Sequence, residues 1–252
     1  MLLKVSSKTL VGQDKHNFSI DYNNITLPYE KDYEIALVQY SMPYSWHNLS
    51  SKYNNNIFSY STNGGGSYTN ITIPNGNYSI EELNDYIVST LGNSNIVIQA
   101  NFNTGRVELV LANNHGVDFS VANSFRGLLG FDSAVVVNTS GVTTTTSATN
   151  PADINRGIEA ISIHTNLVDA KNSLLNEKFS TSIFSFVPKT GPQSILAENI
   201  PNPIYVGVSL HGPLGRIQYS VRDNLGNIVD LEGESITLTF HLREHQEVLH
   251  NK

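Results

Sequence analysis

From residue 157 onward, apolar and polar side chains alternate along the chain. In residues 216–222, Ile217, Tyr219 and Val221 fall on one side of an extended segment, and residues 235–243 repeat this pattern. Successive side chains of a strand point to opposite faces of a sheet. The alternation therefore predicts strands with one face on a core and the other on solvent or a partner. Three more strand-like stretches, residues 158–164, 182–187 and 204–209, recur at regular intervals.

The first part of the chain also contains strand signals. Residues 33–40 are almost continuously apolar, as expected of a strand covered on both faces, and residues 57–60 form a shorter strand-like stretch. When residues from about 64 to 151 are set aside, roughly eight strands remain, which is the number in a two-sheet jelly roll. We therefore predict an all-β fold, a single jelly roll (a two-sheet β-sandwich) built from residues 1–63 and 152–252.

The segment between these two parts carries a well-signalled helix. Ser79 and Glu82 have the spacing of a capping box, and Gly92 lies where a left-handed C-terminal cap belongs. The apolar residues of one helical stripe are Ile80, Leu83, Ile87 and Leu91.

A hairpin follows the helix. Residues 95–100 and 106–111 are strand-like, and Gly105 between them supplies the left-handed residue that a short turn needs. Residues 142–151 are polar and of low complexity, as in an exposed loop. We predict that residues 64–151 are an inserted α+β segment with one helix, one hairpin and a polar loop.

Composition excludes several classes of function. The 252 residues include no cysteine, so disulfides and thiolate metal sites are absent. The net charge is −7 and no cluster of Lys and Arg occurs, which argues against direct nucleic-acid binding. No apolar run approaches the roughly 20 residues of a membrane span. The first residues lack the apolar core of a signal peptide, so we expect synthesis in a cytosolic compartment without secretion.

The histidines do not form a recognisable metal site. His241 and His245 are four residues apart, a spacing that chelates a metal on a helix. His241 lies on the polar face of an alternating strand, however, where that spacing separates two residues by about 13 Å. We therefore predict a solvated strand face and no metal ligands.

Catalytic signatures are equally weak. His164 has Asp169 five residues later, but the Gly-x-Ser-x-Gly elbow of a serine hydrolase is missing. Asp230, Glu232 and Glu234 surround a turn glycine, as solvated turns do. Residues 212–216 lack the Gly-Lys-Ser/Thr of a phosphate loop. We predict a protein that is not an enzyme and has no catalytic residues and no cofactor.

Several stretches resemble a known viral family when they are taken in order. They are residues 33–46, 73–83, 128–131, 157–168, 186–192 and 222–243. Together they cover most of the chain. They resemble the penton-type minor capsid protein of polinton-like and adintovirus-like elements and, more distantly, of virophages.

The resemblance implies a structural function. It implies a single jelly roll that forms a homopentamer at the five-fold vertices of an icosahedral shell, beside a double-jelly-roll major capsid protein. The expected location is the virion capsid, assembled inside the host cell. The family has no catalytic residues to transfer. We expect the insertion to face outward or to bridge to a neighbour.

Contacts with partners are expected at a small set of residues. Trp46 lies in a loop after a buried strand, where it is either a core plug or an interface anchor. The candidate interface residues are Trp46, His47, Arg156, Pro188 and Lys189. The alternative function is a jelly-roll receptor- or carbohydrate-binding spike module, which predicts a shallow aromatic site and a trimer or a monomer. An enzyme is the third possibility.

Overall fold

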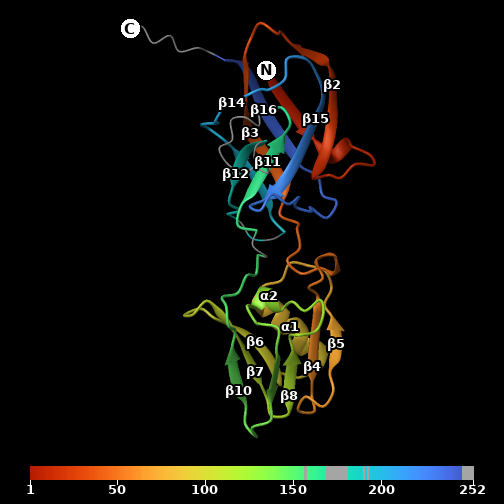
Figure 1. The fold of residues 1–252 in the computed structure, drawn as a ribbon, viewed down its shortest axis with the longest axis vertical. Coiled ribbons are helices and arrows are strands. Elements are labelled where there is room, and N and C mark those ends of the chain that lie inside the picture. Colours follow the sequence, from red (N-terminus) through yellow and green to blue (C-terminus); the bar gives the residue numbers. More distant parts are fainter. Residues whose placement is uncertain (156–157, 169–180, 190, 192, 246–252) are drawn as a thin grey trace. The chain divides into compact units, whose positions relative to one another are not determined.

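The structure is a computed structural model, and it describes residues 1–155, 158–168, 181–189, 191 and 193–245. The chain divides into two compact units, each with its own apolar core. The first unit combines Met1–Trp46 with Ile158–Lys252, and the second is His47–Gly157. Figure 1 shows that both units are built mainly of strands.

The first unit is a sandwich of two antiparallel sheets. One sheet has the order β1-β16-β3-β13, and β14 also pairs with β3. Its strands are β1 (Leu2–Ser6), β16 (Thr237–Glu244), β3 (Tyr33–Pro43), β13 (Ile195–Asn199) and β14 (Val206–Gly207). The other sheet has the order β12-β11-β15-β2. Its strands are β12 (Ser182–Phe186), β11 (Ile161–Thr165), β15 (Gly212–Asp223) and β2 (Asn17–Leu27).

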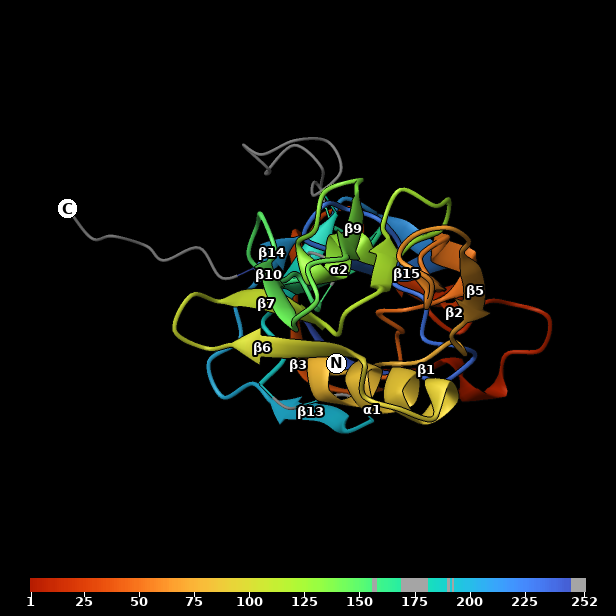
Figure 2. The same cartoon turned by 90° about the horizontal axis from the view of Figure 1, so that it is seen from below.

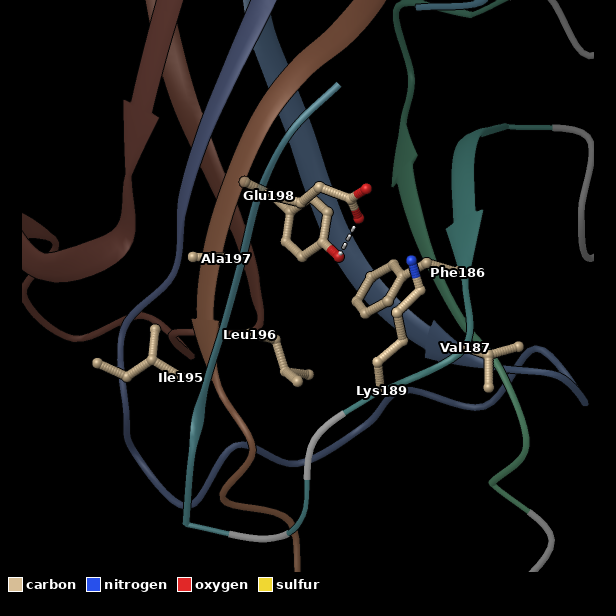
Figure 3. Close-up of a pocket in the computed structure, with 8 residues that line it drawn as sticks. Phe186, Val187, Lys189, Ile195, Leu196, Ala197 and Glu198 are labelled. Carbon is tan, nitrogen blue, oxygen red and sulfur yellow. Dashed lines mark hydrogen bonds between the residues drawn. The ribbon is translucent and has the colours of Figure 1, made fainter. Parts of the chain in front are cut away.

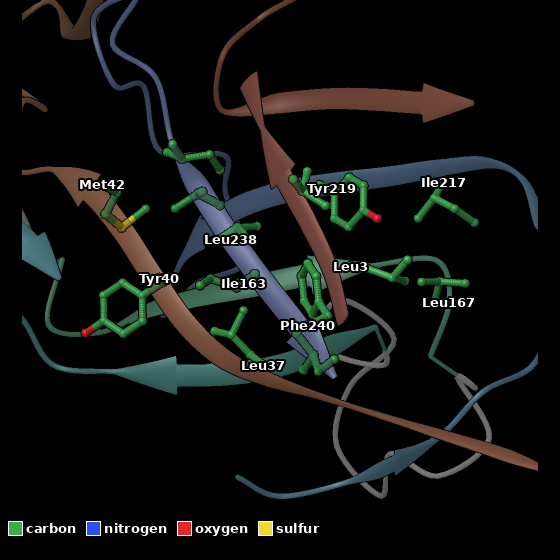
Figure 4. Packing of buried hydrophobic residues seen from close by; sticks show 14 of the residues in the cluster. Leu3, Leu37, Tyr40, Met42, Ile163, Leu167, Ile217, Tyr219, Leu238 and Phe240 are labelled. Atoms are coloured by element: carbon green, nitrogen blue, oxygen red, sulfur yellow. The ribbon is translucent and has the colours of Figure 1, made fainter. Parts of the chain in front are cut away.

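The core of this unit lies between the two sheets (Figure 4). The alternating residues of the sequence direct their apolar side chains inward. Tyr219 of β15 and Phe240 of β16 are fully buried, and their rings lie 5.6 Å apart between centroids. Thr237 and Thr239 of β16 stay partly exposed on the other face. The predicted all-β, two-sheet jelly roll is confirmed.

The second unit also contains two antiparallel sheets. The three-stranded sheet has the order β10-β7-β6, from β10 (Thr144–Ser147), β7 (Arg106–Leu111) and β6 (Ile96–Asn101). The four-stranded sheet has the order β5-β4-β8-β9. Its strands are β5 (Thr69–Thr72), β4 (Ile57–Ser61), β8 (His115–Asp118) and β9 (Val135–Asn138). The helices are α1 (Ile80–Leu91) and the single turn α2 (Arg126–Leu129).

The helix α1 forms where the sequence predicts it. The Ser79 hydroxyl accepts a hydrogen bond of 3.1 Å from the Glu82 N–H, and the Glu82 carboxylate accepts one of 2.8 Å from the Ser79 N–H. Gly92 ends the helix with a φ of 69°, a left-handed conformation that glycine adopts without steric cost. The helix runs beside β6 (Figure 2), and the Asn84 side chain accepts a 2.9 Å hydrogen bond from the Ile98 N–H.

The boundaries of the second unit differ from the ones expected for the insertion. The expected segment was residues 64–151, whereas the compact unit is His47–Gly157. The difference arises because β4 pairs with β5 and β8, and Phe58 of β4 is buried in the core of the second unit. The Asn48 side chain also donates a 2.9 Å hydrogen bond to the Ile154 carbonyl, which ties the two ends of the unit together.

The two helices are short. Within the part of the chain that the structure covers, neither has the length and apolar character needed to cross a bilayer.

Candidate functional site

A groove opens along one side of the jelly roll, between the edge strands of its two sheets. Strand β12 ends one sheet and β13 ends the other. The groove has a volume of about 230 Å³ and is drawn in Figure 3. Its lining is mostly apolar and consists of Tyr40, Phe186, Val187, Lys189, Ile195, Leu196, Ala197 and Glu198. This is the candidate functional site, because it joins apolar surface with two charged groups.

The floor of the groove is closely packed. The rings of Tyr40 and Phe186 stack with centroids 4.5 Å apart, and Leu196 is buried beside them. The Tyr40 hydroxyl donates a hydrogen bond of 3.2 Å to the Glu198 carboxylate. Burial, followed by the negative charge of Glu198, raises the pKa of Tyr40 to about 12. The phenol is therefore neutral at pH 7 and remains a hydrogen-bond donor.

The rim of the groove exposes apolar side chains to solvent. Ile195 is 70% exposed and Val187 is 62% exposed. Lys189 is exposed at the same rim, and Pro188 is half-buried beside it in the chain. Two sequence-predicted interface residues thus lie at or next to the groove. Ile195 was missed, although the apolar run that begins there is a signal that could have indicated it.

The other predicted interface residues lie elsewhere. Trp46 is buried in the jelly-roll core, and its indole stacks on the Tyr44 ring at 3.9 Å between centroids. This burial supports the core-plug interpretation of Trp46. His47 is the first residue of the second unit and is partly exposed. Arg156 lies outside the described residues.

A serine and a histidine meet in the second sheet of the jelly roll. The Ser162 Oγ lies 2.9 Å from the Nε2 of His164, and the Nδ1 of His164 lies 3.0 Å from the Thr181 hydroxyl. His164 is only 2% exposed. Burial, followed by the positive charge of Arg222, lowers the pKa of His164 to about 4. The imidazole is therefore neutral at pH 7.

The distance between the Ser162 Oγ and the His164 Nε2 is that of a catalytic dyad, but the hydrogen-bonding pattern of the two residues is different. The Ser162 hydroxyl also lies 3.3 Å from the backbone carbonyl of Arg222, to which it donates. When the Ser162 hydroxyl donates to the Arg222 carbonyl, Nε2–H of His164 donates to Ser162 and the Thr181 hydroxyl donates to Nδ1. In this tautomer the nitrogen that faces Ser162 carries a proton and cannot accept one, as a general base must. The arrangement supports a structural role across the strands. Asp169, the acid named with His164 in the sequence, lies outside the described residues.

The histidines of β16 and its end have partners within the jelly roll. The Tyr205 hydroxyl lies 2.6 Å from the Nδ1 of His241, and the Arg243 guanidinium sits 3.5 Å above the Tyr205 ring centroid. His245 lies 3.3 Å from the Glu34 carboxylate, which also accepts a hydrogen bond of 2.5 Å from Arg243. These contacts make a polar outer face on the sheet that contains β16.

Comparison with known proteins supports the fold. No protein-family model and no curated protein matches the sequence. Among solved structures, the chain is similar to the crystal structure of the mavirus penton protein, with a TM-score of 0.50 and 10% sequence identity. The match covers 97% of this chain and 99% of the mavirus chain, so it includes both the jelly roll and the second unit. The chain therefore shares its all-β fold with the mavirus penton protein.

Proposed function

We propose that this protein is a penton-type minor capsid protein, which forms homopentamers at the five-fold vertices of an icosahedral shell. The observation that carries the proposal is the extent of the structural likeness to the mavirus penton protein, which takes in nearly the whole of both chains. A jelly roll alone occurs in proteins of many functions. A likeness that covers 97% of this chain and 99% of the mavirus chain extends beyond a jelly roll and is more specific.

The proposal includes the organisation of the chain and its partners. Residues 47–157 are an inserted domain with its own core, and they enter the jelly roll between Trp46 and Ile158. The jelly roll contacts further copies of itself and a double-jelly-roll major capsid protein. The protein resides in the virion capsid after assembly inside the host cell, and it has a structural, non-enzymatic function.

Size-exclusion chromatography with light scattering tests this function. The purified protein is measured alone and after mixing with the double-jelly-roll major capsid protein of the same virus. We expect a pentamer in at least one of the two conditions. A species that stays monomeric in both conditions would overturn the proposal.

One observation favours the alternative, a receptor- or carbohydrate-binding module. Phe102, at the tip between β6 and β7, is 87% exposed, and Asn101 and Asn103 flank it. An exposed aromatic ring can stack on a sugar, and the Asn103 side chain follows it in the chain, whereas the Asn101 amide is hydrogen-bonded to Glu108. The alternative predicts glycan binding that is lost in Phe102→Ala, together with a monomer or trimer. A glycan array and the oligomeric state separate it from the capsid function.

A further inference from the structure

The exposed apolar side chains of the jelly roll occur at its sides and loops, whereas the outer faces of its two long strands are polar. The outward residues of β16 include Thr239 and Arg243, and those of β15 include Arg216 and Gln218. The β12/β13 edge exposes Ile195 and Val187 at the rim of the groove. A surface of this kind favours a partner at the edge over one on the face.

The opposite side of the jelly roll also exposes apolar residues. It is formed by β1, the far end of one sheet, and by β2, the far end of the other. Leu2 of β1 is 66% exposed, and Val11, in the connection from β1 to β2, is almost fully exposed. The jelly roll thus has two unlike edges, the β12/β13 edge and the β1/β2 edge, each with apolar side chains in solvent.

The strands at these edges have complementary directions. Strand β1 pairs antiparallel with β16, β16 with β3, and β3 with β13, so β1 runs antiparallel to β13. Both strands have five residues, and within the described part of the chain no strand pairs with the outer edge of either. Rotation about an axis parallel to the strands keeps the direction of every strand. A second copy of the chain generated in this way would therefore place its β1 antiparallel to β13 of the first copy. This is the arrangement of every ladder in the sandwich, and edge strands readily accept such an addition.

The charges of the two edges are complementary as well. In the sheet that ends in β1 and β13, Lys4 is exposed on the outer face of β1, opposite Thr239. Glu198 is exposed on the core-facing side of β13, opposite Tyr40, so the two charges would attract across the new strand pair from opposite faces of the sheet. In the other sheet, Asp21 is exposed on β2, and Lys189 is exposed just after β12. Each sheet therefore ends in a positive group on one edge and a negative group on the other. A contact between two β1 edges would instead place Lys4 against Lys4, which is repulsive.

We propose that the β12/β13 edge of one copy docks against the β1/β2 edge of a second copy of this chain. In this contact β1 of the second copy lies alongside β13, and its Leu2 lies on the same outer face of the sheet as Ile195. A contact between unlike edges is head-to-tail, and it closes into a ring when the rotation between copies allows. The edges of both sheets take part, because a stable interface buries on the order of 800 Å² on each partner. The inference rests on the proposed homopentamer and names the surfaces that build it.

Cysteine cross-linking tests the contact directly, because the chain has no cysteine of its own. Lys4→Cys and Ala197→Cys are made singly and together, and a short thiol-reactive cross-linker is added. We expect the double variant to give a ladder up to a covalent pentamer. The two single variants should give dimers when co-expressed and none when expressed alone. Leu225→Cys with Ala197→Cys is the control pair, since Leu225 is exposed in the turn that follows β15.

The outcomes separate this inference from the proposed function. Suppose that light scattering shows a pentamer in which Lys4→Cys cross-links to itself, or in which Lys4→Cys and Ala197→Cys do not cross-link. Either result would overturn the edge contact but would leave the proposed penton function intact. A protein that is monomeric in every condition would overturn both.

A second variant gives a readout that does not depend on cross-linking. Ile195→Glu places a charge at the groove rim, and it should leave the fold intact because Ile195 is already in solvent. We expect its pentamer to dissociate at a protein concentration at least ten-fold higher than that of the unaltered chain, whereas Leu225→Glu should match the unaltered chain. Equal effects of the two variants would contradict the proposed surface.

Discussion

The Tyr40 hydroxyl donates a 3.2 Å hydrogen bond to the Glu198 carboxylate, and the two residues are direct partners in the pairing of β3 with β13. The bond links the floor of the groove to its rim. The Tyr40 ring is buried and stacks on Phe186 of the other sheet, while the Glu198 carboxylate remains in solvent. One side chain therefore joins the two sheets and orients the acidic group of the proposed interface.

Removing this hydrogen bond should have a small effect on stability. Tyr40→Phe keeps the stacked ring and removes only the donor, so we expect the free energy of unfolding to fall by about 1 kcal/mol. Tyr40→Ala also removes the ring and should cost about 3–5 kcal/mol. Urea unfolding followed by circular dichroism measures both. Tyr29→Phe, at an exposed tyrosine, is the control and should change nothing measurable.

The buried His164 should make the jelly roll less stable in mild acid. Its pKa is lowered from 6.5 to about 4 in the folded chain, so between these values the unfolded chain binds a proton that the folded chain does not. The contribution of the neutral His164 to the free energy of unfolding is complete above pH 6.5 and declines as the pH falls towards 4. At 1.36 kcal/mol per pKa unit, the loss between pH 7 and pH 5 is about 2 kcal/mol.

Chemical denaturation at several pH values measures this loss. His164→Gln removes the titrating group, so its stability should change less between pH 7 and pH 5. His211→Gln, at an exposed histidine, should keep the pH dependence of the unaltered chain. Identical pH profiles for all three proteins would show that His164 does not act in this way.

The capping box should stabilise the second unit locally. Ser79→Ala removes the acceptor for the Glu82 N–H at the start of α1, and we expect a loss of about 1 kcal/mol. Ser89→Ala, on the exposed side of the same helix, should be neutral or slightly stabilising because alanine is the better helix former. Thermal unfolding of the two variants checks this, and an equal loss in both would argue against the cap.

The second unit should fold as a separate fragment. A fragment of residues 47–157 contains both sheets, both helices and a complete apolar core. We expect it to unfold cooperatively in urea. The shorter fragment 64–151 lacks β4 and the buried Phe58, and it should lack a cooperative transition. If both fragments behave alike, β4 is not needed to complete this core.

The features that the sequence predicts well are local ones. Alternation in β15 and β16 is encoded in each strand by itself, because every second side chain must face the core. The start of α1 is encoded by Ser79 and Glu82, which are three residues apart. Both kinds of signal can be recognised without knowing what the segment packs against.

The features that the sequence does not predict depend on contacts between distant segments. Strand β4 has five residues, and nothing within them indicates which sheet it joins. Strand β13 was missed because it is an edge strand with mostly exposed side chains, and its conformation comes from pairing with β3. The groove combines side chains from β3, β12 and β13, so no motif in the sequence marks it.

Electron microscopy of the purified oligomer, with class averages viewed along its symmetry axis, tests the central claim most directly. The account predicts rings of five subunits with a mass of about 140 kDa, five times the 27.7 kDa of the chain. In such rings the jelly rolls would join side by side through unlike edges. Averages with three-fold symmetry, or particles of single subunits under every condition that includes the major capsid protein, would contradict it.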